Sequence, residues 1–152
     1  MSDTNDLKRR LTGYGDADFA NYLRRSFAKS MGYSDEMLRR PIIGIATSES
    51  GFNNCHRLMH ELVEAVKRGV TAAGGLPITF PTISLGEVFL HPTSMMFRNL
   101  MSMAVEEMIH AQPMSAVILV GGCDKTVPGR HFGWPACDPG GCGTNADGPL
   151  LR

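Results

Sequence analysis

Short apolar runs alternate with longer amphipathic segments between residues 41 and 129. The runs "PIIGIATS", "LPITF" and "SAVILVGG" predict strands near residues 42–47, 77–80 and 115–121, the first of them buried. The segments between them, "HRLMHELVEAVKRGVTAAGG" and "TSMMFRNLMSMAVEEMIHAQP", predict two helices. Strand, helix, strand, helix, strand is the order of an α/β fold, so we expect a parallel sheet with helices on both faces.

The first of these helices has two overlapping apolar stripes. Gly74 and Gly75 mark its C-terminal end, and Pro113 ends the second helix. Helical spacing assigns the main stripe of the first helix to Leu58, Leu62, Val66 and Val70, which Met59 and Val63 widen.

The two ends of the chain differ from this middle part. Residues 1–40 predict a short helical arm, because "DFANYLRRSFAKSMGY" has apolar residues at helical spacing, namely Phe19, Tyr22, Leu23, Phe27 and Met31. Residues 130–152 are rich in Gly and Pro and have no periodicity, so we expect an irregular tail. The chain is therefore divided into an arm, an α/β part over residues 41–129, and a tail.

The composition excludes several classes of protein. The 152 residues include 15 Lys and Arg against 15 Asp and Glu, so no overall positive field attracts nucleic acid or anionic lipid. No apolar run approaches the roughly 18 residues of a membrane span, and the N-terminus lacks the apolar stretch of a signal peptide. We therefore expect a cytoplasmic protein that binds neither nucleic acid nor membrane. Four cysteines without a CxxC pair then favour metal or redox chemistry over a disulfide framework.

The candidate chemistry follows the ends of the predicted strands. The loops 47–55, 81–92 and 121–128 leave the carboxyl ends of the strands, where open α/β sheets bind their ligands. They carry two cysteines, two acidic residues and a lysine: Cys55, Glu87, Cys123, Asp124 and Lys125. Soft sulfur and hard oxygen ligands at one sheet edge suit an iron–sulfur centre beside a magnesium ion.

Each of these residues also has a purely structural interpretation. A lone cysteine such as Cys55 is often a small buried hydrophobe. Glu87 taken alone fits a solvated loop carboxylate, and Asp124 with Lys125 fits a turn and a solvated charge. The convergence of these residues on one edge of the sheet favours the functional interpretation.

Two other kinds of site have less support. "GGCDKT" after a strand is similar to the end of a phosphate loop, but Asp124 stands where the glycine before the lysine belongs and would repel phosphate. His56 and His60 are four residues apart but have no third ligand nearby. We therefore expect them to be an exposed pair on the helix.

Three segments of the chain resemble a known family. "RPIIGIATSESGFNNCHRLMHELVEAVKRGVTAAGGLPITFPTISLGEVF" and "MSAVILVGGCDKTVPG" closely resemble the N-terminal domain of the dihydroxy-acid and sugar-acid dehydratases, and "SLGEVFLHPTSMMFRNLMSM" is most similar to the pentonate and aldonate branch. The resemblance covers residues 20–129, with both cysteine motifs in register. It implies a hydro-lyase that converts a small-molecule sugar acid, or a related 2,3-dihydroxy acid, to a 2-keto-3-deoxy acid. Members are typically homo-oligomers.

The resemblance also implies roles for the five residues at the sheet edge. Cys55 and Cys123 match two of the three cysteines that hold a 2Fe–2S cluster. Glu87 and Asp124 match carboxylate ligands of a neighbouring Mg²⁺, and Lys125 matches a catalytic-site lysine whose carbamylation makes it a metal ligand. The cluster is then expected to activate the substrate's 3-hydroxyl as a leaving group, while Mg²⁺ binds the carboxylate and the 2-hydroxyl.

The tail departs from the family pattern after Gly129. The family continues into a small-residue helix, supplies its third cysteine later, and adds a β-rich second domain with the serine expected to act as base. Neither Cys137 nor Cys142 lies on the third-cysteine motif. We therefore expect a truncated, inactive fragment of a dehydratase. The alternative is a non-catalytic remnant or an interaction module that pairs with full-length subunits.

Overall fold

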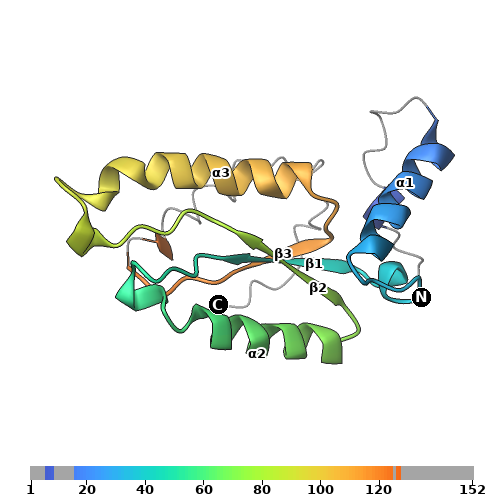
Figure 1. Cartoon of the computed structure of the whole chain (residues 1–152), viewed down its shortest axis with the longest axis horizontal. Coiled ribbons are helices and arrows are strands. Elements are labelled where there is room, and N and C mark those ends of the chain that lie inside the picture. Colours follow the sequence, from blue (N-terminus) through green and yellow to red (C-terminus); the bar gives the residue numbers. More distant parts are fainter. Residues whose placement is uncertain (1–5, 9–15, 125, 128–152) are drawn as a thin grey trace.

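Three parallel strands form the centre of the molecule (Figure 1). The computed structural model describes residues 6–8, 16–124 and 126–127. In the sheet, the order of strands is β2-β1-β3, with bounds Leu76–Pro81 for β2, Ile42–Thr47 for β1 and Ala116–Leu119 for β3. The bounds of β1 and β2 agree with the predicted strands to within one residue, whereas β3 ends two residues before the predicted 121. The predicted α/β fold with a parallel sheet is confirmed.

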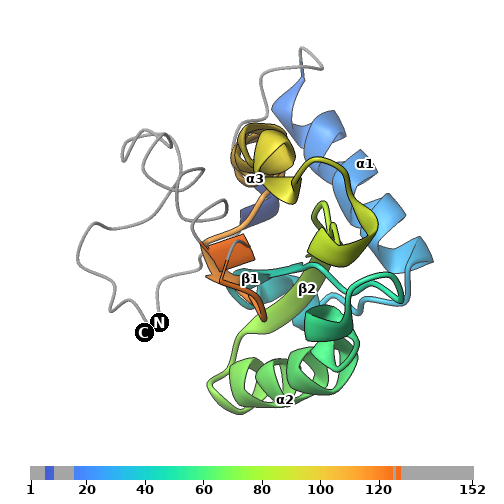
Figure 2. The ribbon, with the colours of Figure 1, turned by 90° about the vertical axis from the view of Figure 1, so that its left-hand side faces the viewer.

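Two helices cover opposite faces of the sheet, as predicted. α2 (Met59–Ala72) lies along one face and α3 (Arg98–Ala111) along the other (Figures 1 and 2). Short 3₁₀ turns precede them in the chain, namely η3 (Asn54–His56), η4 (Glu87–Phe89) and η5 (Ser94–Phe97). Within the described part of the chain, no helix is long and apolar enough to cross a membrane.

The end of α2 confirms the predicted glycine cap. Gly74 has a positive φ of 86°, a conformation that side chains other than that of glycine rarely adopt. Its N–H donates to the carbonyl of Thr71 (3.0 Å), and the N–H of Gly75 donates to the carbonyl of Val70 (2.9 Å). These two bonds satisfy carbonyls that the helix end would otherwise leave unpaired, and they turn the chain into β2.

Each face of the sheet has its own hydrophobic core. Ile45 of β1 is completely buried and packs with Met59, Val63 and Val120 on the α2 side. The next residue, Ala46, faces the opposite side, as expected for neighbours in a strand. The core on that side is larger and includes Ile42, Leu76, Phe80, Val105, Ile109 and Met114.

The main stripe assigned to α2 from the sequence is correct for Val66, which packs against the core on this side, but wrong for Leu58 and Leu62. Met59 and Val63 are buried, whereas Leu58 and Leu62 are 54% and 49% exposed. Both stripes are apolar and lie next to each other on the helix, so spacing alone does not distinguish them. The stripe that faces the sheet is the one that meets Ile45, which is a tertiary contact.

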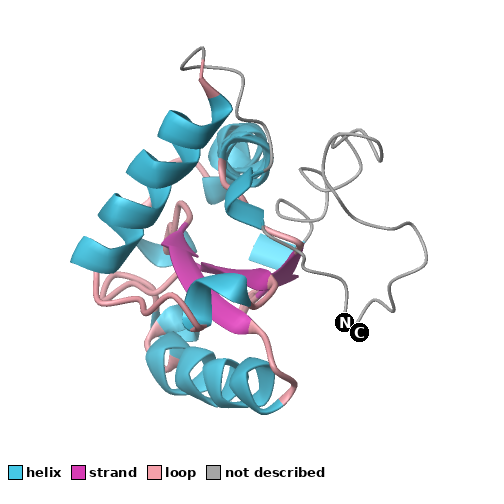
Figure 3. Cartoon of the chain, turned by 90° about the vertical axis from the view of Figure 1, so that its right-hand side faces the viewer, coloured by secondary structure: helices cyan, strands magenta, loops and turns pink. Residues whose placement is uncertain are grey.

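The N-terminal arm packs at the amino-terminal edge of the sheet (Figure 3). It consists of η1 (Asp6–Lys8), α1 (Ala17–Ser30) and η2 (Met37–Arg39). The buried Asp6 carboxylate ties the arm to the sheet, because its Oδ2 accepts from the Ile42 N–H (2.8 Å) and from Ser115 Oγ (2.5 Å). The predicted helix is confirmed, but several of its spaced apolar residues are more than half exposed: Phe19, Tyr22, Phe27 and Met31.

Asp35 forms ion pairs with the end of α1. Its carboxylate contacts Lys29 Nζ (2.7 Å) and the Arg25 guanidinium. Hydrogen bonds from Lys29 and then Arg25 hold the pKa of Asp35 below its ordinary value. A lowered pKa means that this contribution to stability is present above the ordinary pKa and is lost as the pH falls through the folded value.

We expect Asp35→Asn to lower the thermal unfolding midpoint slightly at neutral pH and less at a pH below the folded-state pKa of Asp35. The effect is small because both partners of the ion pair are partly solvated. Thermal unfolding followed by circular dichroism at the two pH values measures it. An equal loss at both pH values would contradict the assignment.

Candidate functional site

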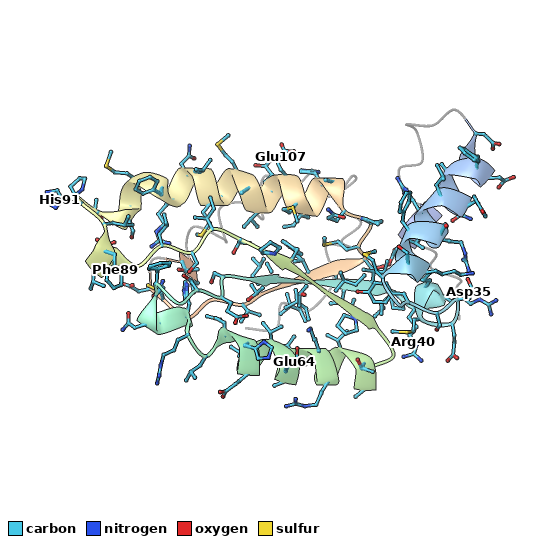
Figure 4. The ribbon with its side chains drawn as sticks, in the orientation of Figure 1. Asp35, Arg40, Glu64, Phe89, His91 and Glu107 are labelled. Carbon is cyan, nitrogen blue, oxygen red and sulfur yellow. The ribbon has the colours of Figure 1, made fainter. Side chains whose placement is uncertain are left out.

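The three loops predicted to carry the site meet at one end of the sheet, on the left in Figure 1 and towards the viewer in Figure 2. Phe89 and His91 mark this end in Figure 4, and Asp35 lies at the opposite end. Phe52 of the first loop and Phe89 of the second form an edge-to-face ring pair with centroids 6.5 Å apart. A Cβ on Gly86 would overlap the carbonyl oxygen of Phe52, so the two backbones are in close contact.

Cys55 lies in η3, in the segment that leads into α2. Its backbone N–H donates to Oδ1 of the buried Asn53 (3.1 Å), and the N–H of His56 donates to the Asn53 carbonyl (2.9 Å). Asn53 thereby fixes the shape of the turn through its side chain and its backbone. Cys55 is exposed and its thiol is free. The alternative that it is a small buried hydrophobe is therefore wrong.

Cys123 begins a tight turn shortly after β3. The N–H groups of Thr126 and Val127 donate to its carbonyl at 3.1 and 3.2 Å. The preceding Gly122 packs against the other cysteine turn, because a Cβ on it would lie 2.5 Å from the Cys55 carbonyl oxygen. The two cysteine turns are thus in contact, as expected for residues that share one sheet edge. The Cys123 thiol is also free and is half-buried.

Glu87 opens η4, and the turn that follows holds its carboxylate. Oε1 accepts from Thr93 Oγ1 (2.8 Å), and Oε2 accepts from the Ser94 N–H (2.9 Å). The side chain is half-buried. The protein therefore fixes the orientation of the Glu87 carboxylate. A carboxylate that is merely solvated in a loop would have no such contacts.

Asp124 and Lys125 follow Cys123 directly. Asp124 is exposed, and its Oδ1 lies 3.3 Å from the Cys123 Sγ, so an oxygen and a sulfur stand side by side on this turn. Lys125 lies outside the described residues, and its role stays a prediction.

The prediction for His56 is wrong. It was expected to be exposed beside His60, but it is completely buried, and its ring hydrogen-bonds to Ser84 Oγ (2.7 Å) and Thr126 Oγ1 (3.2 Å). His60 is exposed as predicted, with Nδ1 3.9 Å from a carboxylate oxygen of Glu49. The one signal for His56 in the sequence is its position, directly after a candidate ligand and between the end of a strand and the start of a helix.

The described residues fit the implied metal centre in part. Cys55 and Cys123 place two thiols on contacting turns, and Glu87 and Asp124 add oxygen donors at the same sheet edge, so the types of donor suit iron–sulfur and magnesium ligation. However, no group of three or more His, Cys, Asp or Glu side chains in the described part of the chain is arranged to hold a metal ion.

Comparison with known proteins agrees with this architecture. A family model described as dihydroxy-acid/6-phosphogluconate dehydratase N-terminal matches residues 40–138. The chain belongs to this family. The match includes the sheet, α2, α3 and all five candidate residues, and it runs past residue 129. The division of the chain at residues 40 and 129 stays a prediction.

Relatives of the chain are dehydratases of sugar acids and of dihydroxy acids. It is 43% identical over 139 residues to the L-arabonate dehydratase of Azospirillum brasilense, and the matched stretch covers 91% of this chain and 24% of that protein. It is 41% identical over 126 residues to the L-arabinonate dehydratase of Rhizobium leguminosarum bv. trifolii (82% and 22%), and 39% identical over 114 residues to the dihydroxy-acid dehydratase of Clostridium novyi (72% and 21%). The chain spans about a quarter of the length of these relatives.

Proposed function

We propose that this chain supplies one wall of a hydro-lyase site that dehydrates a sugar acid, an aldonate or pentonate, to a 2-keto-3-deoxy acid. The observation that carries the proposal is the contact between the two cysteine turns at Gly122, which brings residues 55 and 123 to one sheet edge. The names of the relatives support the substrate class, since L-arabonate and L-arabinonate are sugar acids. A 2,3-dihydroxy acid such as the Clostridium relative's substrate is the second choice.

The five residues have distinct roles in this proposal. Cys55 and Cys123 provide two thiolate ligands of a 2Fe–2S cluster, and Glu87, Asp124 and Lys125 as its carbamate bind Mg²⁺. When bound, these groups supply the Lewis acidity that makes the 3-hydroxyl a better leaving group and stabilises charge on the substrate carboxylate. A reducing compartment such as the cytoplasm suits the two free thiols.

The contacts around Glu87 support its role in orienting the substrate. Thr93 and Ser94 donate to different oxygens of the carboxylate, so its plane is fixed relative to η4 and η5. A carboxylate that is positioned in advance loses less conformational entropy when it takes up a cation. In the proposed enzyme, the side chain of Glu87 would therefore hold Mg²⁺, with the substrate carboxylate bound to it, at a constant place on the sheet edge.

One observation favours the interaction module as a second candidate. Phe52, Val88 and Phe89 are 77%, 80% and 71% exposed at the rim of the site. Large apolar side chains grouped on a surface are typical of regions that another protein surface covers. In the proposed enzyme, further domains or a second subunit of a homo-oligomer would cover this rim. In the alternative, the same rim would bind full-length subunits without catalysis.

The test uses a chimaera in which residues 40–129 of this chain replace the matching segment of the L-arabonate dehydratase. We expect Cys55→Ser or Cys123→Ser to abolish the visible absorption of the cluster after anaerobic reconstitution, because each removes a thiolate ligand. We expect Glu87→Gln to leave the absorption in place and to weaken Mg²⁺-dependent dehydration of L-arabonate.

The matched control is Glu64→Gln on α2, whose carboxylate pairs with Lys67 at 2.7 Å and lies outside the site loops. It should leave both the absorption and the activity unchanged. Full cluster content in both cysteine variants would refute the ligand assignment, and a Glu87 variant as active as the Glu64 variant would refute the magnesium assignment.

A further inference from the structure

A buried hydrogen-bond network joins the three site loops. Its centre is the ring of His56, which is completely buried. Its Nδ1 lies 3.1 Å from Nδ2 of Asn53 and 2.7 Å from Oγ of Ser84, and its Nε2 lies 3.2 Å from Oγ1 of Thr126. Asn53 belongs to the loop of Cys55, Ser84 to the loop after β2, and Thr126 to the turn of Cys123. One side chain therefore contacts all three loops.

The partners of Asn53 determine which ring nitrogen carries the proton. The Asn53 Oδ1 accepts from the Cys55 N–H (3.1 Å), and its Nδ2 donates to the carbonyl of Leu85 (3.2 Å). The amide is therefore oriented, and it faces His56 with its NH₂ group, which only donates. The Nδ1 of His56 must accept, so in the neutral ring the proton is on Nε2, which donates to Thr126.

The network continues from Thr126 to the carboxylate of Glu87. Arg98 contacts Thr126 Oγ1 through Nη1 (3.5 Å) and Ser94 Oγ through Nη2 (2.9 Å). The Ser94 N–H in turn donates to Glu87 Oε2 (2.9 Å). The His56 ring is thus connected to the candidate thiol turns on one side and to the candidate magnesium ligand on the other.

We propose that His56 is a positioning residue, which sets the separation of the Cys55 and Cys123 thiols through its Nε2–H bond to Thr126. The inference rests on the proposed function in that these thiols are the ligands being positioned. Thr126 lies one turn after Cys123 and donates its N–H to the Cys123 carbonyl (3.1 Å), while Asn53 holds the Cys55 N–H. The rigid imidazole of His56 bridges Asn53 on one side and Thr126 on the other. Because the ring is buried, water does not compete for these two hydrogen bonds.

Two pairs of variants separate this role from a general loss of stability. In His56→Gln the amide nitrogen reaches the place of Nε2 and keeps a donor for Thr126, whereas in His56→Asn the shorter amide reaches only the place of Nδ1. Thr126→Val removes the hydroxyl at nearly constant volume, and Thr126→Ser keeps it. His60→Asn, on the exposed histidine of α2, is the control.

The experiment measures the distance between the thiols in the full chain without any cluster. Cys137 and Cys142 are replaced by Ser, and dibromobimane, a short reagent that fluoresces when it bridges two thiols, is reacted with Cys55 and Cys123. We expect His56→Asn and Thr126→Val to slow bridging about tenfold, since a buried hydrogen bond is lost and the closed arrangement of the turns is less populated. His56→Gln, Thr126→Ser and His60→Asn should bridge nearly as fast as the parent.

Alkylation of single thiols by monobromobimane should be the same in all variants, because the reactivity of each thiol is unchanged. Equal bridging in the parent, His56→Asn and Thr126→Val would overturn the inference. If a His56 variant fails to fold by circular dichroism, the Thr126→Val and Thr126→Ser pair decides alone. The bridging assay does not depend on iron, so it tests the positioning role separately from the proposed function. If bridging is slowed as expected but the Cys55→Ser variant still binds a cluster, the positioning role stands and the proposed function is refuted.

Discussion

Gly122→Ala should separate the two cysteine turns and destabilise the fold. A Cβ on Gly122 would lie 2.5 Å from the Cys55 carbonyl oxygen and 2.5 Å from Cε of Met59. The methionine end can move, but the carbonyl belongs to η3 and cannot retreat without moving Cys55. Forcing an extra methyl group into such a contact typically costs about 1–3 kcal/mol.

Two measurements check this prediction. Chemical denaturation of the chain gives the free energy of unfolding, and dibromobimane bridging gives the separation of the Cys55 and Cys123 thiols. The control is Gly69→Ala in α2, where a Cβ meets nothing within 4 Å. It should stabilise the chain by about 0.5–1 kcal/mol, because alanine is the better helix former. A Gly122 variant that unfolds and bridges like the Gly69 variant would show that the turns are not in contact.

The strands and helices could be predicted because apolar runs and helical spacing are properties of the local sequence. "SAVILVGG" and "PIIGIATS" are apolar over the length of a strand, and both became neighbouring strands of one sheet. Order along the chain then placed the candidate residues at one edge, since parallel strands connected by helices point the same way. The site loops could therefore be located before any side-chain contact was known.

Contacts between loops could not be predicted in the same way. His56 and Leu62 were misplaced because the choice between exposure and burial depends on residues far away in the chain. For His56 these are Ser84 and Thr126, which lie 28 and 70 residues later. For Leu62 the choice depends on which face of α2 meets Ile45. Periodicity reports that a face is apolar, and only the packing of the sheet shows which apolar face is covered.

The contact between Gly122 and Cys55 belongs to the same class. A glycine pair after a strand indicates a turn, but many turns use glycine for its backbone freedom alone. Gly122 has a different use here, because the space for its side chain is occupied by the backbone of η3. The sequence predicts that the two cysteine loops share an edge. The structure adds that the backbone of the Cys55 loop leaves no room for a Cβ on Gly122.

The 152-residue chain alone should dehydrate aldonates at least about 100-fold more slowly than the L-arabonate dehydratase. A positioned proton-transfer group alone is typically worth about 10²–10⁴-fold in rate, and an incomplete metal centre would slow the reaction further. The described residues supply two thiols and no group of three metal-binding side chains. Cys55 and Asp124 are exposed, so water reaches the sheet edge at which charge would develop. Solvent of high dielectric weakens each electrostatic contact with that charge.

The assay is anaerobic reconstitution of the chain with iron, sulfide and Mg²⁺, followed by measurement of 2-keto-3-deoxy acid from a panel of aldonates. The chimaera, treated in the same way, shows whether residues 40–129 are competent when the remaining domains cover the edge. We expect slow turnover by the chain and measurable turnover by the chimaera. The two proteins share the same cysteines and carboxylates and differ in the protein that surrounds them. Turnover of the chain within a few-fold of the chimaera would contradict the prediction, because the chain alone would then hold a complete metal centre and a proton-transfer group.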